Sequence, residues 1–176
     1  MRCEGQFELE KFLDLVRLAM ERYFGDDRRR IEHAYSVFGH ARALLKTIEA
    51  DQAVTLTAAY LHDIGILEAE RKYGSCSGQL QEREGPPVAR AMLEGLNAPA
   101  DLAEKVCTLI SRHHTPQGID SHEFRILWDA DALVNLSEFL PRNSSPAIIR
   151  LLDQRLVTQA GIRRGLNYFL ADGECD

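Results

Sequence analysis

Histidine and aspartate residues recur beside apolar segments of this sequence, in types and an order that suit metal binding. The four segments are IEHAYSV with His33, AAYLHDIG with His62 and Asp63, ISRHHTP with His113 and His114, and LWDADALVNL with Asp129 and Asp131. Imidazole and carboxylate together suit borderline divalent metals such as Mn, Fe, Co, Ni or Zn, and Mg is a further candidate. A site of two histidines and two aspartates leaves coordination positions open for water and substrate. The set predicts a site for one divalent metal ion.

The adjacent pair His62 and Asp63 raises a specific question, because it ends an otherwise apolar helical segment. A buried carboxylate is costly unless it is paired, hydrogen-bonded or coordinated to a metal. Taken singly, a histidine on an apolar face is usually a core residue, and an aspartate before a helix is usually an N-cap. The ordered set favours a cation that offsets the desolvation of the pair. Ile64 and Gly65 are then expected to let the chain turn away.

The elements that position these residues are predicted to be helices. Apolar residues follow the three-and-four spacing of a buried helical face in the ranges 9–23, 31–48, 54–61, 88–96, 102–113, 133–140, 148–156 and 162–170. Gly25 to Asp27 breaks the first helix and caps the second, and Pro116 is expected to end the fifth. The best strand-like candidate, EFRILW, is short, and no alternation of strands and helices occurs. We expect an all-α fold with one domain over residues 1–176.

Residues 66–85 differ from the rest of the chain. They are polar, rich in glycine and weakly periodic, so we expect a loop or a frayed helical excursion there. The sequence leaves open whether this segment covers the site as a lid. The first helix and the last two are expected to cover the core, and they could also form the face of a homodimer.

Composition limits the class of protein. The chain has 176 residues, 45% of them hydrophobic, which suits one soluble globular domain with a sizeable core. The formal net charge of −6 gives no basic field for double-stranded nucleic acid or a membrane surface. The four cysteines form no CxxC pair, which favours free thiols. No signal-peptide pattern or membrane-length apolar run occurs, so we expect a cytoplasmic protein.

The segments RIEHAYSV, LHDIG and DADAL together resemble the HD-domain superfamily of metal-dependent phosphohydrolases, which is named for its adjacent His-Asp pair. The resemblance spans about Arg30 to Leu136. It is strongest to small bacterial single-domain members, in which a motif like LISRHH precedes the final aspartate. The resemblance implies a helical bundle in which side chains from separate helices meet on one metal. Carried over residue by residue, the implied ligands are His33, His62, Asp63 and Asp131.

The resemblance also assigns the nearby acidic and imidazole residues. Periodicity alone does not choose between Asp129 and Asp131, but the family pattern Ala-Asp-x-Leu falls on residues 130–133 and so implies Asp131. Asp129 is then expected to be an N-cap or to orient a metal-bound histidine. Two-metal members carry a further histidine at the place of Glu82, while His113 and His114 remain candidates for a second ion. We therefore expect one metal.

The predicted reaction is hydrolysis of a phosphate ester, in a nucleotide or a small phosphorylated metabolite, by a metal-activated water. Asp63 would ligate the ion and orient the water, and His113 would bind the phosphate or protonate the leaving oxygen. The candidates for substrate binding are Arg71, Lys72, Arg112 and Asn135, of which Asn135 resembles an asparagine of the alarmone-hydrolase branch.

Two other functions stay open at this point. Many relatives carry a lysine or an acidic residue where this chain has Ile66, which motivates a metal- and nucleotide-binding module without turnover. A di-iron oxygenase of the HD type would require at least six protein ligands, and Glu82 in place of a histidine disfavours it.

Overall fold

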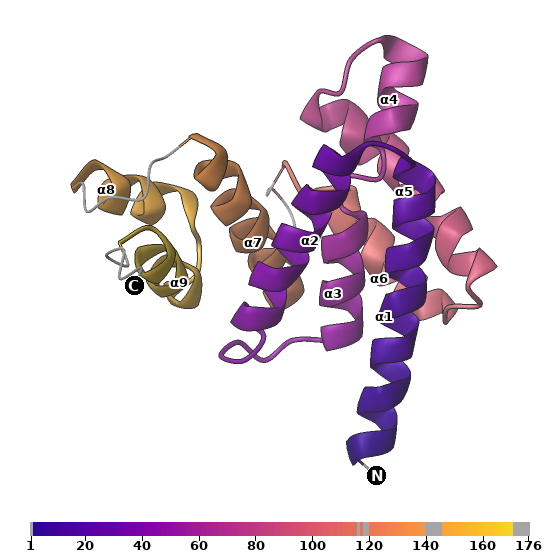
Figure 1. The fold of residues 1–176 in the computed structure, drawn as a ribbon, viewed down its shortest axis with the longest axis horizontal. Helices are drawn as coiled ribbons and strands as arrows, with labels where there is room; N and C mark the ends of the chain where they lie inside the picture. The colour runs from indigo at the N-terminus through magenta and orange to yellow at the C-terminus, as the bar shows by residue number, and fades with distance from the viewer. Residues whose placement is uncertain (1, 116, 118–119, 140–145, 171–176) are drawn as a thin grey trace.

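A computed structural model describes residues 2–115, 117, 120–139 and 146–170, and all the regular secondary structure in these ranges is α-helical (Figure 1). The predicted all-α class is confirmed. In chain order the helices are α1 (Arg2–Phe24), α2 (Arg28–Leu44), α3 (Gln52–Leu61), α4 (Ile66–Tyr73), α5 (Gly78–Gly95), α6 (Ala100–Ile110), α7 (His122–Phe139), α8 (Pro146–Arg155) and α9 (Gln159–Leu170).

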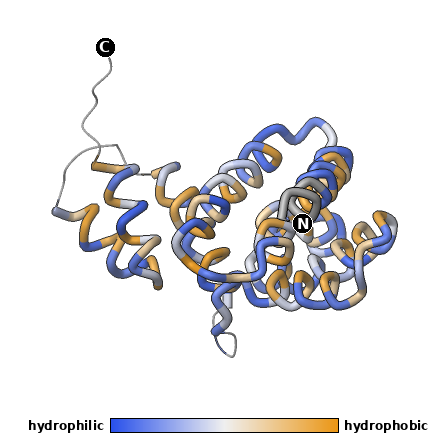
Figure 2. The backbone as a smooth tube through the Cα atoms, turned by 90° about the horizontal axis from the view of Figure 1, so that it is seen from below, coloured by the Kyte–Doolittle hydropathy of each residue, from blue (hydrophilic) through white to orange (hydrophobic). Residues whose placement is uncertain are grey.

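Helix α3 is the central element of the bundle. It packs against α1, α2, α6 and α7, and every residue from Val54 to Leu61 is buried. A helix that is covered on all sides can be apolar on all sides, which explains why its sequence is apolar beyond a single stripe. The surrounding helices are amphipathic, and Figure 2 shows their apolar and polar residues alternating along the tube.

Of the loop or frayed helical excursion expected at residues 66–85, the loop is wrong, because this segment forms α4 and the first part of α5, with a break at residues 74–77. The buried face of α5 includes the polar residues Gln81 and Glu84. Because the prediction looked for apolar residues at helical spacing, it did not detect this part of the helix. Both side chains are satisfied internally: Gln81 donates to the carbonyl of Cys76, and Glu84 accepts from Lys72 and Tyr73. Gly74 ends α4 at a φ of 65°, a left-handed conformation that glycine adopts without strain.

The structure also settles the strand-like candidate, in agreement with the all-α expectation, and corrects one helix end. The strand-like EFRILW lies inside α7, where Phe124, Ile126 and Leu127 are buried in a spacing that an alternating strand would not give. Helix α6 ends at Ile110, before the expected stop; Pro116 itself lies outside the described residues.

Helices α8 and α9 form a small second cluster beside α7 (Figure 1). Its buried apolar residues are Leu133, Ile148, Leu152, Leu156 and Phe169. The carboxylate of Asp129 fixes the junction, since it accepts hydrogen bonds from the backbone N–H of Val157 at 2.7 Å and of Thr158 at 3.0 Å, and from the Thr158 hydroxyl. Thr158 in turn accepts from the N–H of Gly161. Asp129 therefore supports the start of α9, as a helix cap would, and orients no metal ligand.

Two further observations bear on the class of protein. Cys76 is exposed and Cys107 is buried, and both are free thiols, while the side chain of Cys3 and all of Cys175 lie outside the described residues. No helix in the described ranges is long and apolar enough to span a bilayer.

Candidate metal centre

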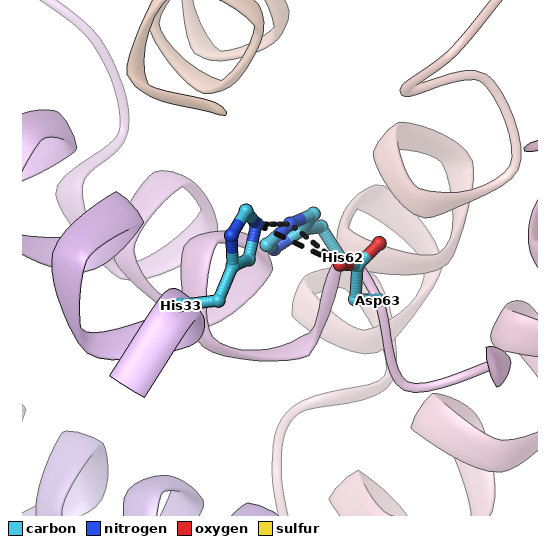
Figure 3. A group of neighbouring side chains, drawn as sticks. All are labelled: His33, His62 and Asp63. Carbon is cyan, nitrogen blue, oxygen red and sulfur yellow. Dashed lines mark hydrogen bonds and ion pairs between the residues drawn. The ribbon is translucent and has the colours of Figure 1, made fainter. Parts of the chain in front are cut away.

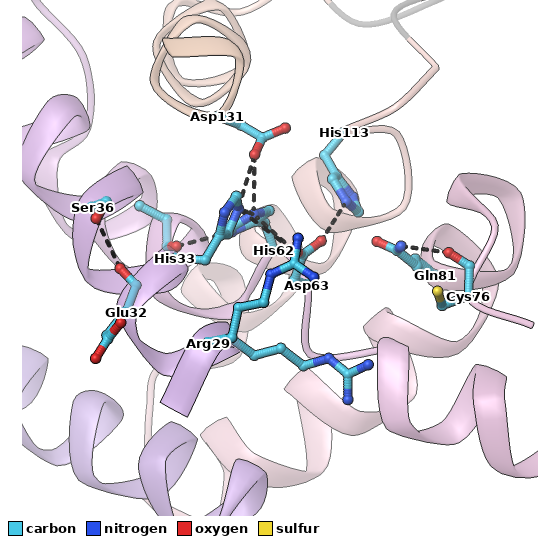
Figure 4. A network of polar contacts seen from close by, with 12 residues as sticks. Arg29, Glu32, His33, Ser36, His62, Asp63, Cys76, Gln81, His113 and Asp131 are labelled. Atoms are coloured by element: carbon cyan, nitrogen blue, oxygen red, sulfur yellow. Dashed lines mark hydrogen bonds and ion pairs between the residues drawn. The ribbon is translucent and has the colours of Figure 1, made fainter. Parts of the chain in front are cut away.

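Four side chains from three parts of the bundle converge on one point. His33 comes from α2, His62 and Asp63 from the end of α3, and Asp131 from α7 (Figures 3 and 4). The His33 Nε2 atom lies 3.2 Å from His62 Nε2 and 3.1 Å from Asp131 Oδ1. The Asp63 Oδ2 atom lies 3.6 Å and 3.5 Å from the two imidazole nitrogens. The sequence prediction named these four residues, and the fold brings them together.

The end of α3 orients His62 toward this point. The ring is fully buried, and its Nδ1 lies 3.0 Å from the carbonyl oxygen of Ala59. A carbonyl only accepts, so Nδ1 carries the proton and the lone pair of Nε2 is left for a cation.

Gly65 allows a close helix contact just after this pair. Residues 62–65 form the expected turn between α3 and α4, and Gly65 has a φ of −74°, which any residue can adopt. A Cβ atom at this position would lie 2.5 Å from the carbonyl oxygen of Gln81 and 2.6 Å from the backbone nitrogen of Gly85. The missing side chain lets α5 pack directly against the His-Asp segment.

The geometry of the four donors suits a divalent cation. Ligand bonds of about 2.0–2.2 Å give neighbouring donors roughly 2.8–3.6 Å apart in octahedral or tetrahedral geometry. Five of the six separations among the four donor atoms are 3.1–3.6 Å and fall within that range. The set of two imidazole nitrogens and two carboxylates also suits Mn, Fe, Co, Ni or Zn in its chemistry.

An unsatisfied polar atom beside the cluster supports the same interpretation. His113 is buried, and its Nδ1 lies 2.7 Å from the carbonyl oxygen of Ile110. Within the described part of the chain its Nε2 atom makes only a long contact of 3.4 Å with Asp63 Oδ1, which Figure 4 shows as a dashed line. Buried polar atoms usually have well-formed partners, so this nitrogen is available to a ligand bound at the cluster.

The electrostatics of the cluster are those of a cation site. Burial lowers the pKa of His62, but the neighbouring Asp63 and Asp131 outweigh it and raise the pKa to about 9. Burial raises the pKa of Asp131, but its contacts with the His33 and His62 imidazoles hold the pKa below its ordinary value. The carboxylates stay ionised, and a proton on His62 takes the place of the positive charge when no metal is bound.

A second group of potential ligands shares Asp63. One donor atom each of Asp63, His113 and His114 lies within 4.8 Å of the others. His114 Nε2 is 3.0 Å from Gln81 Oε1. Glu82 is not part of this group, since its carboxylate accepts from the backbone N–H of His114 and from the Thr115 hydroxyl. Glu82 thus holds the turn that carries the two histidines.

Two cavities flank the metal centre, and Asn135 lines both. One, of about 370 Å³, is lined by His113, His114 and Asp131 on one side, and by Trp128 and Arg155 among others. The second, of about 330 Å³, is lined by His33 and Asp63 together with Arg29, Arg30 and Cys76. Both are open beside the proposed ligands, so a substrate can approach from either side.

The cationic residues expected at the substrate do not line either cavity. Arg71 is exposed and pairs with Glu68, and Lys72 pairs with Glu84 beside a different groove. Arg112 follows α6 and lines neither cavity. The arginines that do line the cavities are Arg29, Arg30 and Arg155. The run of three arginines at 28–30 was a visible signal for the first two, whereas nothing in the sequence marked Arg155.

Comparisons with known proteins agree with this geometry. The HD domain family model matches residues 30–136, which is more than half of the chain. The crystal structure of a predicted HD superfamily hydrolase from an uncultured Thermotogales bacterium is similar, with 25% sequence identity and a TM-score of 0.61 over 95% of this chain and 90% of that one. A search of curated proteins gives no match. The match of the family model to the segment that carries all four converging side chains establishes that this chain belongs to the HD domain family.

Proposed function

We propose that this protein hydrolyses a phosphate ester, in a nucleotide or a small phosphorylated metabolite, with a divalent cation held by His33, His62, Asp63 and Asp131. Membership of the HD domain family and the similar HD superfamily hydrolase support a metal-dependent hydrolase. The observation that carries the proposal is the convergence of four donor atoms beside two open cavities, in which each imidazole nitrogen lies 3.1–3.6 Å from the other and from both carboxylates. When bound, such a cation supplies Lewis acidity and lowers the pKa of a coordinated water.

Asp63 and His113 are the residues placed to handle protons. One oxygen of Asp63 faces the two imidazoles and the other faces His113 Nε2 at 3.4 Å. Asp63 can thus ligate the cation and accept a hydrogen bond from the attacking water. The contact of His113 Nδ1 with the Ile110 carbonyl fixes its ring and places a proton on Nδ1, so that Nε2 points toward the reacting centre. In the imidazolium form, Nε2 can donate a proton to a phosphoryl or leaving oxygen.

Two of the arginines that line the cavities are candidates for phosphate contacts. The carboxylates of Asp27 and Glu70 already offset the charge of Arg30, so Arg155 is the main source of positive charge. Arg30 is held by Asp27 at 2.9 Å and Glu70 at 2.6 Å, and it lines the same cavity as His33 and Asp63. Arg155 lines the other cavity beside Asp131. The amide of Asn135, which lines both, can hydrogen-bond a substrate from either side.

The proposal is tested by loading purified protein with Mn, Co or Ni and measuring phosphate release from nucleotides and aryl phosphates. We expect phosphate release that requires the metal, and we expect Asp131→Asn to abolish it. No release from metal-loaded protein across the panel contradicts the proposal. Nucleotide binding without release identifies a binding module, and two irons per chain with oxygen uptake identify an oxygenase.

The metal content also separates one ion from two. The group of Asp63, His113 and His114 could hold a second cation, in addition to the ion expected from the sequence. Elemental analysis of the wild type and of His114→Ala distinguishes the two cases. If the site holds one ion, the variant keeps the wild-type ratio of metal to protein. If it holds two ions, the variant loses about half of its metal.

A further inference from the structure

A third cavity, of about 420 Å³, lies between α2 and α9. Among the described residues it shares none with the two cavities at the metal centre. Its lining is Ala43, Leu44, Thr47, Ala160, Arg163, Arg164, Asn167 and Tyr168. The described lining therefore includes two arginines and no acidic side chain.

Arg164 is held in one orientation by a buried histidine of the neighbouring helix. Its Nε donates a hydrogen bond of 2.8 Å to Nδ1 of His40. Burial, together with the charge of Arg164, lowers the pKa of His40 to about 4, so the ring is neutral near pH 7 and can accept this bond. The Tyr168 ring packs edge-on against His40, with 5.4 Å between the ring centroids. This arrangement aligns the guanidinium before any ligand arrives.

The charge of Arg164 has no counter-charge within the described part of the chain. Burial lowers the pKa of Arg164, and Tyr168 alone opposes this shift. Other arginines of the bundle are neutralised: Arg17 pairs with Glu21 at 2.6 Å, and Arg42, on α2 itself, pairs with Glu10. A half-buried cation without a counter-charge is unfavourable, and an anion supplied from outside would offset that cost.

We propose that this cavity is an anion-binding site that takes the oxyanion of a phosphate or carboxylate group. The two terminal nitrogens of Arg164 form a fork that matches two oxygens of such a group. Arg163 adds charge and Asn167 adds amide donors from the adjacent turns of α9. This site is separate from the proposed reaction centre, although α2 carries both His33 and His40. Seven residues separate them, which is about 10 Å along a helix.

The oxyanion can come from two sources. One is a small phosphorylated or carboxylated metabolite. The other is the chain itself, since the sequence ADGECD directly after α9 carries Asp172, Glu174 and Asp176, all of which lie outside the described residues. The recognition chemistry is the same for both, and a variant that ends at Leu170 distinguishes them.

The test is a titration of the full-length protein with inorganic phosphate at constant ionic strength. The Nε–Hε signal of Arg164 in a ¹H–¹⁵N spectrum is assigned by its absence from Arg164→Lys, and it should shift to a saturating value. Arg164→Gln should weaken the binding at least about tenfold, since it removes a bidentate charged contact. Arg150→Gln, an exposed site on α8 with the same change in charge, should alter it less than about twofold, as isolated surface charges do.

Phosphate that binds at the metal centre affects these variants equally, so their difference reports the third cavity alone. An Arg164 signal that does not move, or equal affinities in the two glutamine variants, would overturn the proposal. If Arg164→Gln does not fold, Arg163→Gln replaces it in the comparison with Arg150→Gln. The shift of the Arg164 signal in the wild-type titration then remains the direct test. Tighter binding in the chain that ends at Leu170 identifies the acidic segment as the resident anion. An unchanged affinity identifies an external ligand.

Discussion

Asp129 and Asp131 lie two residues apart on α7, yet they serve two different regions of the molecule. Asp129 is fully buried at the junction with α8 and α9, where it accepts three hydrogen bonds from Val157 and Thr158. Asp131 is at the metal centre and faces the Nε2 atoms of His33 and His62. Burial raises the pKa of Asp129, and its donors offset only part of that effect, whereas the pKa of Asp131 is lowered by the imidazoles despite burial.

The difference shows how to tell a structural carboxylate from a ligand. The partners of Asp129 are N–H and O–H groups of the protein, which satisfy the carboxylate with no additional component. The partners of Asp131 are nitrogens whose lone pairs can also coordinate a cation, so the cluster is complete only with a positive charge among them. What satisfies a buried polar group is thus more informative than its burial.

The largest predicted effect follows from removing the Asp131 carboxylate. Asp131→Asn keeps the shape but loses a charged ligand, so bound metal should fall to a small fraction. The proposed phosphohydrolase activity should fall at least about a thousandfold, because the metal-activated water is lost. The free energy of unfolding of the metal-free form should also fall, because protonated His62 loses a buried counter-charge. Elemental analysis, activity and urea unfolding measure the three quantities.

The matched change is Asp129→Asn, which should leave metal content unchanged and activity within about threefold. Equal loss of metal in both asparagine variants would contradict the division between the two regions.

The second prediction concerns stability at the α8–α9 junction. Asp129→Ala leaves two backbone N–H groups and one hydroxyl without their acceptor, and it should lower the free energy of unfolding by about 3 kcal/mol. Urea unfolding of metal-loaded protein measures this loss. Retained stability would mean that water replaces the carboxylate at Val157 and Thr158, and that the junction does not depend on Asp129.

Sequence reasoning predicted the all-α class, the family and the residues that converge at the metal centre. This was possible because His33, the His62–Asp63 pair and Asp131 each lie in a short motif beside a regular apolar stripe. Their convergence came from the resemblance to the HD-domain superfamily, since periodicity places a residue on a helix face but does not place distant helices beside one another.

The features that the sequence left open or missed have a common physical cause, which is that the deciding partner lies far away in the chain. Asp129 is satisfied by residues 28 and 29 positions later, and Arg155 reaches a cavity lined mainly by α7. Lys72 was expected at the substrate, but Glu84 on α5 pairs with it. Helix α5 was missed in part because its buried face uses Gln81 and Glu84, whose partners become visible only in three dimensions.

The third prediction extends the comparison to His40, another buried polar group that the protein itself satisfies. Its folded-state pKa of about 4 lies below the ordinary value of 6.5, so the unfolded chain takes up the proton first. Stability from neutral His40 is therefore fully present above pH 6.5 and is lost as the pH falls toward 4. At pH 5 the loss amounts to about 2 kcal/mol by proton linkage.

His40→Asn keeps an acceptor for Arg164 but has no titrating ring, so it should reduce this loss. Urea unfolding of the wild type and the variant at pH 7.5 and pH 5 measures the difference. All other ionisable groups are common to both proteins and cancel. Identical pH dependence in the two proteins would show that His40 takes up a proton as readily in the folded state as in the unfolded one.

The smallest predicted effect concerns two glycines that differ only in what lies beside them. A Cβ atom at Gly161 would lie 2.2 Å from Asp129 Oδ2, whereas at Gly39, which is exposed on α2, it would meet nothing within 4 Å. Gly161→Ala should therefore lower the free energy of unfolding by about 1–2 kcal/mol, because the carboxylate must shift from Val157 and Thr158. Gly39→Ala should raise it by up to about 1 kcal/mol, since alanine is the better helix former.

Urea unfolding at pH 7.5 measures both changes, and metal content should stay constant in both variants. Stabilisation by both would mean that the Asp129 carboxylate has room to move, and that the junction tolerates a looser arrangement than the metal centre does.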